Sequence, residues 1–199
     1  MIDRSTEEQR KVFEDVWARG QYRLGSPGQR IVPRFLDIVR RGVNGCPMIN
    51  DYGSGTGRAS LELWKAGYLV NMVDIAENAL EDEAKALIGK GLTFTLASLW
   101  ELPADFPVAP WGYCMEVLMT IPEPKMARTL SEIARTCRNL FVQVYHRHDP
   151  RAGHECNLIQ WDKDRWRDEL LQHYAGVVRI ESLEIPLRYL YVCRGAIKC

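Results

Sequence analysis

Between residues 47 and 146, short apolar runs alternate with longer amphipathic segments, and this alternation is the strongest constraint on the fold. Runs of strand length lie at 47–51, 68–74, 92–97, 111–118 and 139–146, and helical periodicity lies at 57–67, 76–91 and 123–137. Strands that are separated by helices pair in parallel through right-handed crossovers. The pattern therefore predicts an α/β fold with an open, doubly wound sheet.

The flanking segments complete this prediction. Helices are predicted at 5–20, 26–42 and 162–174, and two strand-like runs close the sequence at 177–185 and 187–198. The link between these last runs is too short for a crossover, so it predicts an antiparallel hairpin. We expect a single domain over 1–199 with a Rossmann-like core over 47–199. Its sheet has about seven strands, mostly parallel with a C-terminal antiparallel hairpin, and two N-terminal helices over 1–44 form a lid.

The charge balance excludes some partners. Lys plus Arg and Asp plus Glu each number 26, so no overall positive field attracts nucleic acid or an anionic membrane. No apolar run is long enough to span a membrane, and the charged first residues lack the apolar segment of a signal peptide. We expect a cytoplasmic protein, in the host cytoplasm if it is viral, with no membrane partner and no strong nucleic-acid signal.

The glycine-rich stretch "DYGSGTGRAS" begins at Asp51, where the first predicted strand ends. Glycines at a strand-to-helix turn let a ligand approach the main chain at the carboxyl edge of a sheet. The dinucleotide pattern G-x-G-x-x-G fails in both registers, because Arg58 and Ser60 stand at the third glycine position. The phosphate-loop pattern fails too, since no Lys followed by Ser or Thr occurs at the required place.

The pattern D-x-G-x-G-x-G resembles the signature of class I S-adenosylmethionine-dependent methyltransferases. This cofactor carries an ammonium and a sulfonium and has no phosphate, so an acid such as Asp51 is favourable beside the turn. The wider resemblance, over about residues 13–175, is to small methyltransferase-domain proteins common in bacteriophages and bacteria. It rests on "YRLGSPG", "DYGSGTGRASLEL", "LASLWELP" and the segment from "GYCMEVL" to "IPEPK".

The resemblance implies a set of cofactor contacts. Asp74, at the end of the second strand, would accept hydrogen bonds from the ribose hydroxyls; its alternative role is to cap the next helix. Ser98 takes the place of an adenine-binding acid, with Leu99 beside it. The full predicted set is Asp51, Gly53, Ser54, Gly55, Gly57, Asp74, Ile75, Ser98, Leu99, Glu116 and Val117.

Residues for the acceptor side are less specific. His146 and His148 follow the fifth strand and are the candidate catalytic bases, although a polar loop is also what an ordinary surface connection looks like. Trp17, Tyr22 and Tyr145 are candidates for the lid or the acceptor side, and Trp17 has core packing as its alternative. We expect no metal, since Leu158 breaks an H-E-x-x-H pattern.

These features predict a methyltransferase that uses S-adenosylmethionine, releases S-adenosylhomocysteine and acts on a small or modest-sized acceptor. Met119 and Thr120 stand where the family often has Glu and His, which leaves open a cofactor-binding or regulatory protein without turnover. A second alternative is a nucleotide-dependent enzyme with a degenerate phosphate loop. The acceptor and the oligomeric state are not assigned by the sequence.

Overall fold

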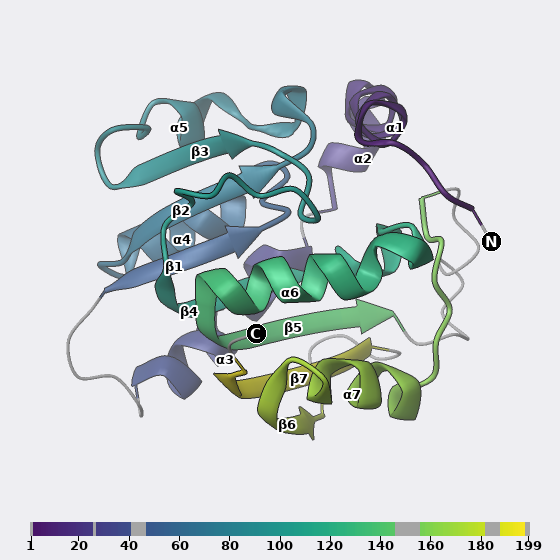
Figure 1. The fold of residues 1–199 in the computed structure, drawn as a ribbon. Coiled ribbons are helices and arrows are strands. Elements are labelled where there is room, and N and C mark those ends of the chain that lie inside the picture. The colour runs from purple at the N-terminus through teal and green to yellow at the C-terminus, as the bar shows by residue number, and fades with distance from the viewer. Residues whose placement is uncertain (1, 26, 41–46, 146–155, 182–187, 198–199) are drawn as a thin grey trace.

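The structure is a computed structural model that describes residues 2–25, 27–40, 47–145, 156–181 and 188–197. Seven strands form one sheet in the order β3-β2-β1-β4-β5-β7-β6 (Figure 1). The strands are β1 (Met48–Tyr52), β2 (Leu69–Asp74), β3 (Leu92–Leu96), β4 (Ala109–Met115), β5 (Cys137–Tyr145), β6 (Tyr174–Ile180) and β7 (Arg188–Ala196). The first five are parallel, and β7 is antiparallel to both β5 and β6. The Rossmann-like sheet and its antiparallel end are as predicted.

The helices also follow the predicted order. The α-helices are α1 (Thr6–Ala18), α2 (Gly20–Arg23), α3 (Pro27–Arg40), α4 (Arg58–Lys65), α5 (Asp82–Lys85), α6 (Met126–Thr136) and α7 (Lys163–Leu171). Short 3-10 helices are η1 (Glu77–Ala79), η2 (Leu118–Thr120) and η3 (Glu123–Lys125). Ser5 begins α1 with a capping box, and Asp162 caps α7 through two backbone N–H groups. The sequence signals for these two helix starts are confirmed.

One predicted helix is much shorter than expected. The periodicity over 76–91 predicts a continuous helix, yet only η1 and the short α5 form, with Leu80 in extended backbone between them. The guanidinium of Arg23 donates to the carbonyl oxygens of Asn78 and Ala79. These carbonyls bind another segment of the chain, and Leu80 is buried in the core. Tertiary contacts therefore override the local helical pattern.

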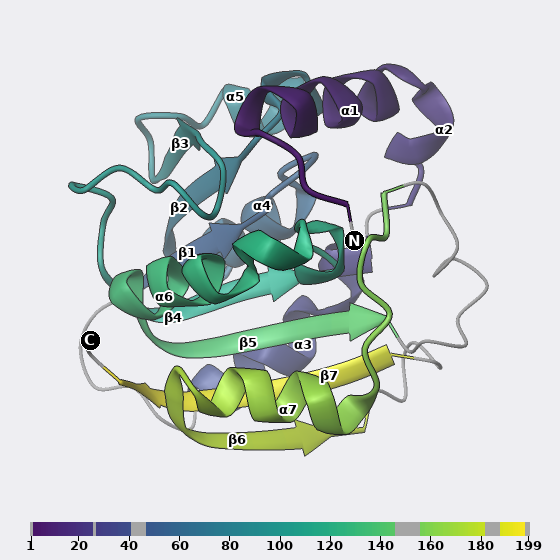
Figure 2. The ribbon, with the colours of Figure 1, turned by 45° about the vertical axis from the view of Figure 1, so that its right-hand side comes forward.

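Helices cover both faces of the sheet. The buried residues of α6 and α7 pack on one face, and those of α3 and α4 pack on the other (Figures 1 and 2). Phe35 of α3 lies 5.8, 5.1 and 5.2 Å, between ring centroids, from Trp111, Tyr113 and Phe141. We expected the helix at 26–42 to belong to a lid, but its apolar face is part of the core beneath the sheet.

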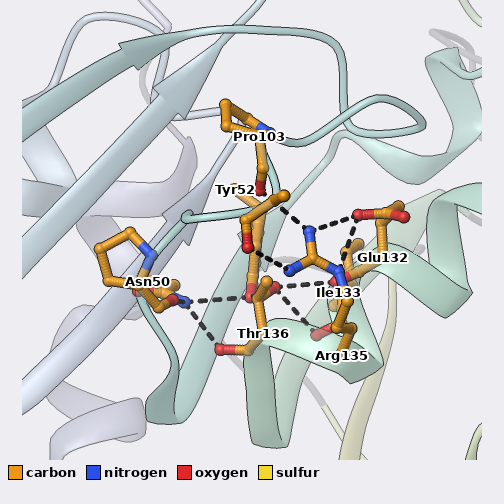
Figure 3. A network of polar contacts seen from close by, with 9 residues as sticks. Asn50, Tyr52, Pro103, Glu132, Ile133, Arg135 and Thr136 are labelled. Carbon is orange, nitrogen blue, oxygen red and sulfur yellow. Dashed lines mark hydrogen bonds and ion pairs between the residues drawn. The ribbon is translucent and has the colours of Figure 1, made fainter.

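A buried polar network ties α6 to the sheet (Figure 3). The side-chain amide of Asn50 donates to the carbonyl of Thr136 at 2.9 Å, and the Tyr52 hydroxyl lies 2.7 Å from the Thr136 hydroxyl. Arg135 donates to the carbonyl of Pro103 at 3.1 Å. The bonds of Asn50 and Tyr52 satisfy polar groups that are buried between α6 and the sheet. The bond of Arg135 is exposed and joins the end of α6 to the loop that precedes β4.

Helices α1 and α2 lie outside these two layers, next to the β2 and β3 side of the sheet (Figure 2). Their contacts are with loops that follow the carboxyl ends of parallel strands. Gln9 donates to the carbonyl of Thr120 at 2.8 Å, Trp100 donates to the hydroxyl of Thr6 at 3.1 Å, and Asn78 donates to the carbonyl of Glu14 at 2.9 Å. Helix α1 thus crosses the edge where a doubly wound sheet binds its ligand.

Candidate cofactor and active site

A cavity of about 370 Å³ lies at the carboxyl end of the parallel strands. Strand β1 pairs with β2 on one side and β4 on the other, so the chain reverses its winding there and leaves a crevice between the loops. The predicted cofactor residues on its wall are Asp51, Gly53, Ser54, Gly55, Asp74, Ile75, Ser98, Leu99, Glu116 and Val117. Of the predicted set only Gly57 is absent from the wall; it begins α4 with φ of +79°.

Two structural reasons require glycine at positions 53 and 55 of the turn. Gly53 and Gly55 have φ of +71° and +51°, a region that side chains other than glycine rarely adopt. A Cβ on Gly55 would stand 3.0 Å from the ring of Trp17, and a Cβ on Gly53 would overlap Val117. Trp17 and Val117 therefore occupy the space that a side chain at Gly55 or Gly53 would need.

Asp74 joins two loops at the cavity wall. One carboxylate oxygen accepts from the N–H of Gly55 at 2.8 Å, and the other accepts from the N–H of Ala76 at 2.9 Å. Asp74 does not cap the next helix, because η1 begins after Ala76 and has no side-chain cap. Burial raises the pKa of Asp74, and the bonds to the N–H groups of Ala76, Gly55 and Ile75 oppose this effect.

Asp51 is 3% exposed and accepts a hydrogen bond of 2.5 Å from the hydroxyl of Ser60, in the first turn of α4. Burial raises the pKa of Asp51 from 3.8 to about 7. The hydrogen bond from Ser60 lowers this pKa, and the neighbouring charge of Asp74 raises it further. A cation in the cavity would stabilise the charged form of Asp51.

Two buried hydroxyls on the wall lack a hydrogen-bond partner. Ser54 is 8% exposed and Ser98 is 2% exposed, and neither side-chain oxygen has a partner in the structure. Buried polar atoms in native proteins are nearly always hydrogen-bonded. Since both residues border the cavity, they are placed to bind a ligand there.

One face of α1 lines the cavity. Gln9, Phe13 and Trp17 follow one another at a spacing of four residues and all border the cavity. Sequence reasoning placed Trp17 here and missed Gln9, although the i, i+4, i+8 spacing was visible. Tyr22, the other lid candidate, lies in α2, and its side chain falls outside what the structure describes.

Glu116 and Tyr145 also border the cavity. Their partners, Gln143 and Arg188, are not among the residues that the sequence predicted. Arg188 comes from β7, and its distance along the chain from Glu116 gave no signal in the sequence. The candidate bases His146 and His148 lie outside the described residues, so their role stays a prediction. In the described ranges, no group of His, Cys, Asp or Glu side chains could hold a metal ion.

Comparison with known protein families gives a match to the methyltransferase domain over residues 49–139. The matched segment holds the glycine turn, Asp74, Ser98 and Glu116, and the seven strands have the arrangement that the motif implied. Residues 49–139 are a methyltransferase domain, and the predicted resemblance to S-adenosylmethionine-dependent methyltransferases is confirmed. A comparison with curated protein sequences finds no match.

Solved structures share the fold of this methyltransferase. Magnesium protoporphyrin IX methyltransferase from Synechocystis, with bound S-adenosylhomocysteine, is 20% identical with a TM-score of 0.71, over 96% of this chain and 100% of that chain. A Burkholderia thailandensis 1,6-didemethyltoxoflavin N1-methyltransferase is 17% identical with a TM-score of 0.75, over 100% and 93%. A Haloferax volcanii methyltransferase in complex with the Trm112 activator is 17% identical with a TM-score of 0.65, over 92% and 97%.

Proposed function

We propose that this enzyme transfers the methyl group of S-adenosylmethionine to a small-molecule acceptor that binds in the same cavity. The strongest support is the pair of buried hydroxyls, Ser54 and Ser98, that have no protein partner on the cavity wall. A ligand with several polar groups would satisfy both.

The residues on the wall fit the cofactor group by group. Asp74 borders the cavity with its carboxylate beside the glycine turn, and in this proposal it accepts from the ribose hydroxyls. Both Asp51 and Ser98 border the cavity. In this proposal Asp51 pairs with the ammonium, and the Ser98 hydroxyl accepts from the adenine amino group. The backbone at Gly53 and Gly55 allows close approach. When bound, S-adenosylmethionine supplies a methyl group on a positively charged sulfur.

The contribution of the protein to this chemistry is mainly positional. Holding two reactants in line is worth about 7–11 kcal/mol of the activation barrier. Helix α1 covers the cavity with Phe13 and Trp17 and is held by hydrogen bonds to the loops after β2, β3 and β4. This cover excludes water from the reacting groups.

A small acceptor is favoured over a macromolecule for two reasons. The cavity is covered by α1, and the chain has 26 basic and 26 acidic residues, so it has no net positive charge for nucleic acid. The neighbours from Synechocystis and Burkholderia bear the names of enzymes acting on small molecules. None of the helices in the described ranges combines the length and apolarity that a membrane crossing needs.

The test is a thermal-shift series with S-adenosylmethionine, S-adenosylhomocysteine, ATP and NAD. A ligand at about 100 times its dissociation constant adds about 2.7 kcal/mol to the free energy of unfolding. We expect a rise in Tm with the two sulfur compounds only. Asp74→Ala should abolish this rise, whereas the matched control Asp82→Ala, at an exposed site on α5, should retain it. A rise with ATP alone would support a nucleotide-dependent enzyme instead.

Turnover is tested separately by following S-adenosylhomocysteine release with a panel of small acceptors. An acceptor-dependent release establishes the transferase reaction. Binding of the cofactor without release from any acceptor of the panel would favour a regulatory protein that has kept the pocket.

A further inference from the structure

Four polar side chains meet beyond the end of β4. Glu116 directly follows β4, Gln143 and Tyr145 belong to β5, and Arg188 begins β7. Glu116 accepts from Arg188 Nε at 2.5 Å, from Gln143 Nε2 at 3.2 Å and from the Tyr145 hydroxyl at 2.9 Å. The Arg188 guanidinium also lies over the Tyr145 ring, 3.9 Å from its centroid. The carboxylate thus has one oxygen on Arg188 and Gln143, and the other on Tyr145.

This cluster is costly to build. Glu116 has φ of +58° and is the one residue other than glycine with positive φ in the described chain, a conformation that costs about 1–3 kcal/mol. The side chains of Arg188 and Glu116 are 0% and 6% exposed. Burying an ion pair rarely gains stability over a well-packed apolar pair. Two separate costs at one residue of the cavity wall indicate a functional constraint.

The residues along the whole cavity wall limit the chemistry of an acceptor that binds there. Among the described wall residues the charged ones are Asp51, Asp74 and Glu116, all acids. An anionic acceptor would meet this negative field without a basic residue of the described wall to pair with. The wall also carries the rings of Phe13 and Trp17, which favour a planar, apolar body.

We propose that Tyr145 is a catalytic residue that binds an uncharged aromatic acceptor through its O–H or N–H group, with Glu116 as the final proton acceptor. This inference rests on the proposed methyl transfer. The Tyr145 hydroxyl donates its proton to Glu116, and Tyr145 borders the cavity. The proposal therefore assigns to the Tyr145 oxygen the role of accepting from the O–H or N–H group. Arg188 acts as a positioning residue, because it holds the Glu116 carboxylate on one side and the Tyr145 ring on the other.

The proton balance of the step is simple. The acceptor heteroatom forms a bond to the methyl carbon while the carbon–sulfur bond breaks, and the electron pair of that bond stays on sulfur. The proton that the heteroatom loses passes to the Tyr145 oxygen, and the Tyr145 proton passes to Glu116. Glu116 then returns this proton to solvent. No oxidant, reductant or metal is required.

Binding of a probe tests the inference without turnover. Phenol and toluene, which differ by a hydroxyl in place of a methyl, are titrated by calorimetry into the protein saturated with S-adenosylhomocysteine. One hydrogen bond is worth about 0.5–1.5 kcal/mol. Tyr145→Phe should therefore weaken the binding of phenol about fivefold and change the binding of toluene by less than about twofold. Glu116→Gln should likewise weaken phenol more than toluene. The matched control is Tyr191→Phe in β7, which removes a tyrosine hydrogen bond to the carbonyl of Lys163 in α7. This variant should change the binding of neither probe.

The outcomes separate the inference from the function on which it rests. Equal weakening of both probes by Tyr145→Phe would assign the cluster a structural role, and failure of phenol to bind the loaded wild type would also overturn the proposal. If the wild type does not bind S-adenosylhomocysteine, the proposed function fails and this inference fails with it. If the wild type binds it and only phenol selectivity is missing, the function stands and the acceptor assignment is wrong.

Discussion

Replacing Asp51 with asparagine should stabilise the folded protein at alkaline pH and have little effect in acid. Asp51 is 3% exposed, and burial raises its pKa from 3.8 to about 7. Between these values the folded chain retains a proton that the unfolded chain releases. The free energy of unfolding therefore falls as the pH rises from about 4 to 7, and it is independent of this group above that range.

The magnitude follows from the difference between the two pKa values. At about 1.4 kcal/mol per pH unit, the rise from 3.8 to about 7 corresponds to a penalty of about 4 kcal/mol above pH 7. Asparagine has no charge to bury, and its carbonyl oxygen can still accept from Ser60. Between pH 5 and pH 8 the advantage of Asp51→Asn over the wild type should grow by about 3 kcal/mol.

Urea unfolding at pH 5 and pH 8, at one ionic strength, measures this change directly. Titrating groups other than the neighbouring Asp74 affect both proteins alike, so the difference between the two stability curves reports Asp51 together with its coupling to Asp74. Parallel curves would show that Asp51 is ionised without penalty in the fold, and the electrostatic reasoning would be refuted.

The same side chain should make cofactor binding depend on pH. If ionised Asp51 pairs with the ammonium of S-adenosylhomocysteine, affinity should rise about eightfold from pH 6 to pH 7.5, since the ionised fraction rises by that factor at a pKa of about 7. Calorimetry at the two pH values measures it. Asp51→Asn should bind more weakly and lose the pH dependence, whereas an unchanged dependence in the variant would assign it to another group.

Three further changes have defined outcomes. Gly55→Ala, at φ +51° and against Trp17, should weaken the binding of S-adenosylhomocysteine at least tenfold. Its control is Gly67→Ala, at φ +93° with no atom of another residue nearby. The control should have a similar backbone strain of about 1–2 kcal/mol and bind S-adenosylhomocysteine as the wild type does. Ser98→Ala should weaken cofactor binding about threefold to tenfold, as measured by calorimetry. Its stability in urea should be unchanged or higher, because the Ser98 hydroxyl has no protein partner. A stability loss above about 1 kcal/mol would contradict this. Arg188→Met should cost about 3–5 kcal/mol in urea, and adding Glu116→Leu should recover most of it; additive costs would show that the pair is not coupled.

Local sequence patterns were sufficient for the architecture and failed where distant segments compete for backbone groups. Alternating runs fixed the parallel strands, and the short link between the last two runs fixed the antiparallel end. Over 76–91 the helical period was clear, but Arg23 binds the carbonyls of Asn78 and Ala79 and Leu80 enters the core. Helix α3 was misassigned to the lid because an apolar face does not reveal which surface it covers.

The cofactor side of the site was visible in the sequence because it is built from short stretches next to strand ends. The glycine turn, Asp74 and Ser98 each follow a strand directly, and parallel strands bring their carboxyl ends to one edge. The acceptor side is different. Glu116 and Tyr145 were predicted as separate site residues, but their link through Arg188 was not, because Arg188 is 72 positions from Glu116.

The sequence by itself determined the fold class and the methyltransferase resemblance, and it predicted residues that line one cavity. It could do so because periodicity and the glycine turn are local properties of the chain. Only the tertiary structure decided which helix covers the cavity, that Asp74 bridges two loops, and that Glu116 meets Arg188. These contacts depend on strand order and register, and a buried ion pair leaves no local pattern in either of the segments that it joins.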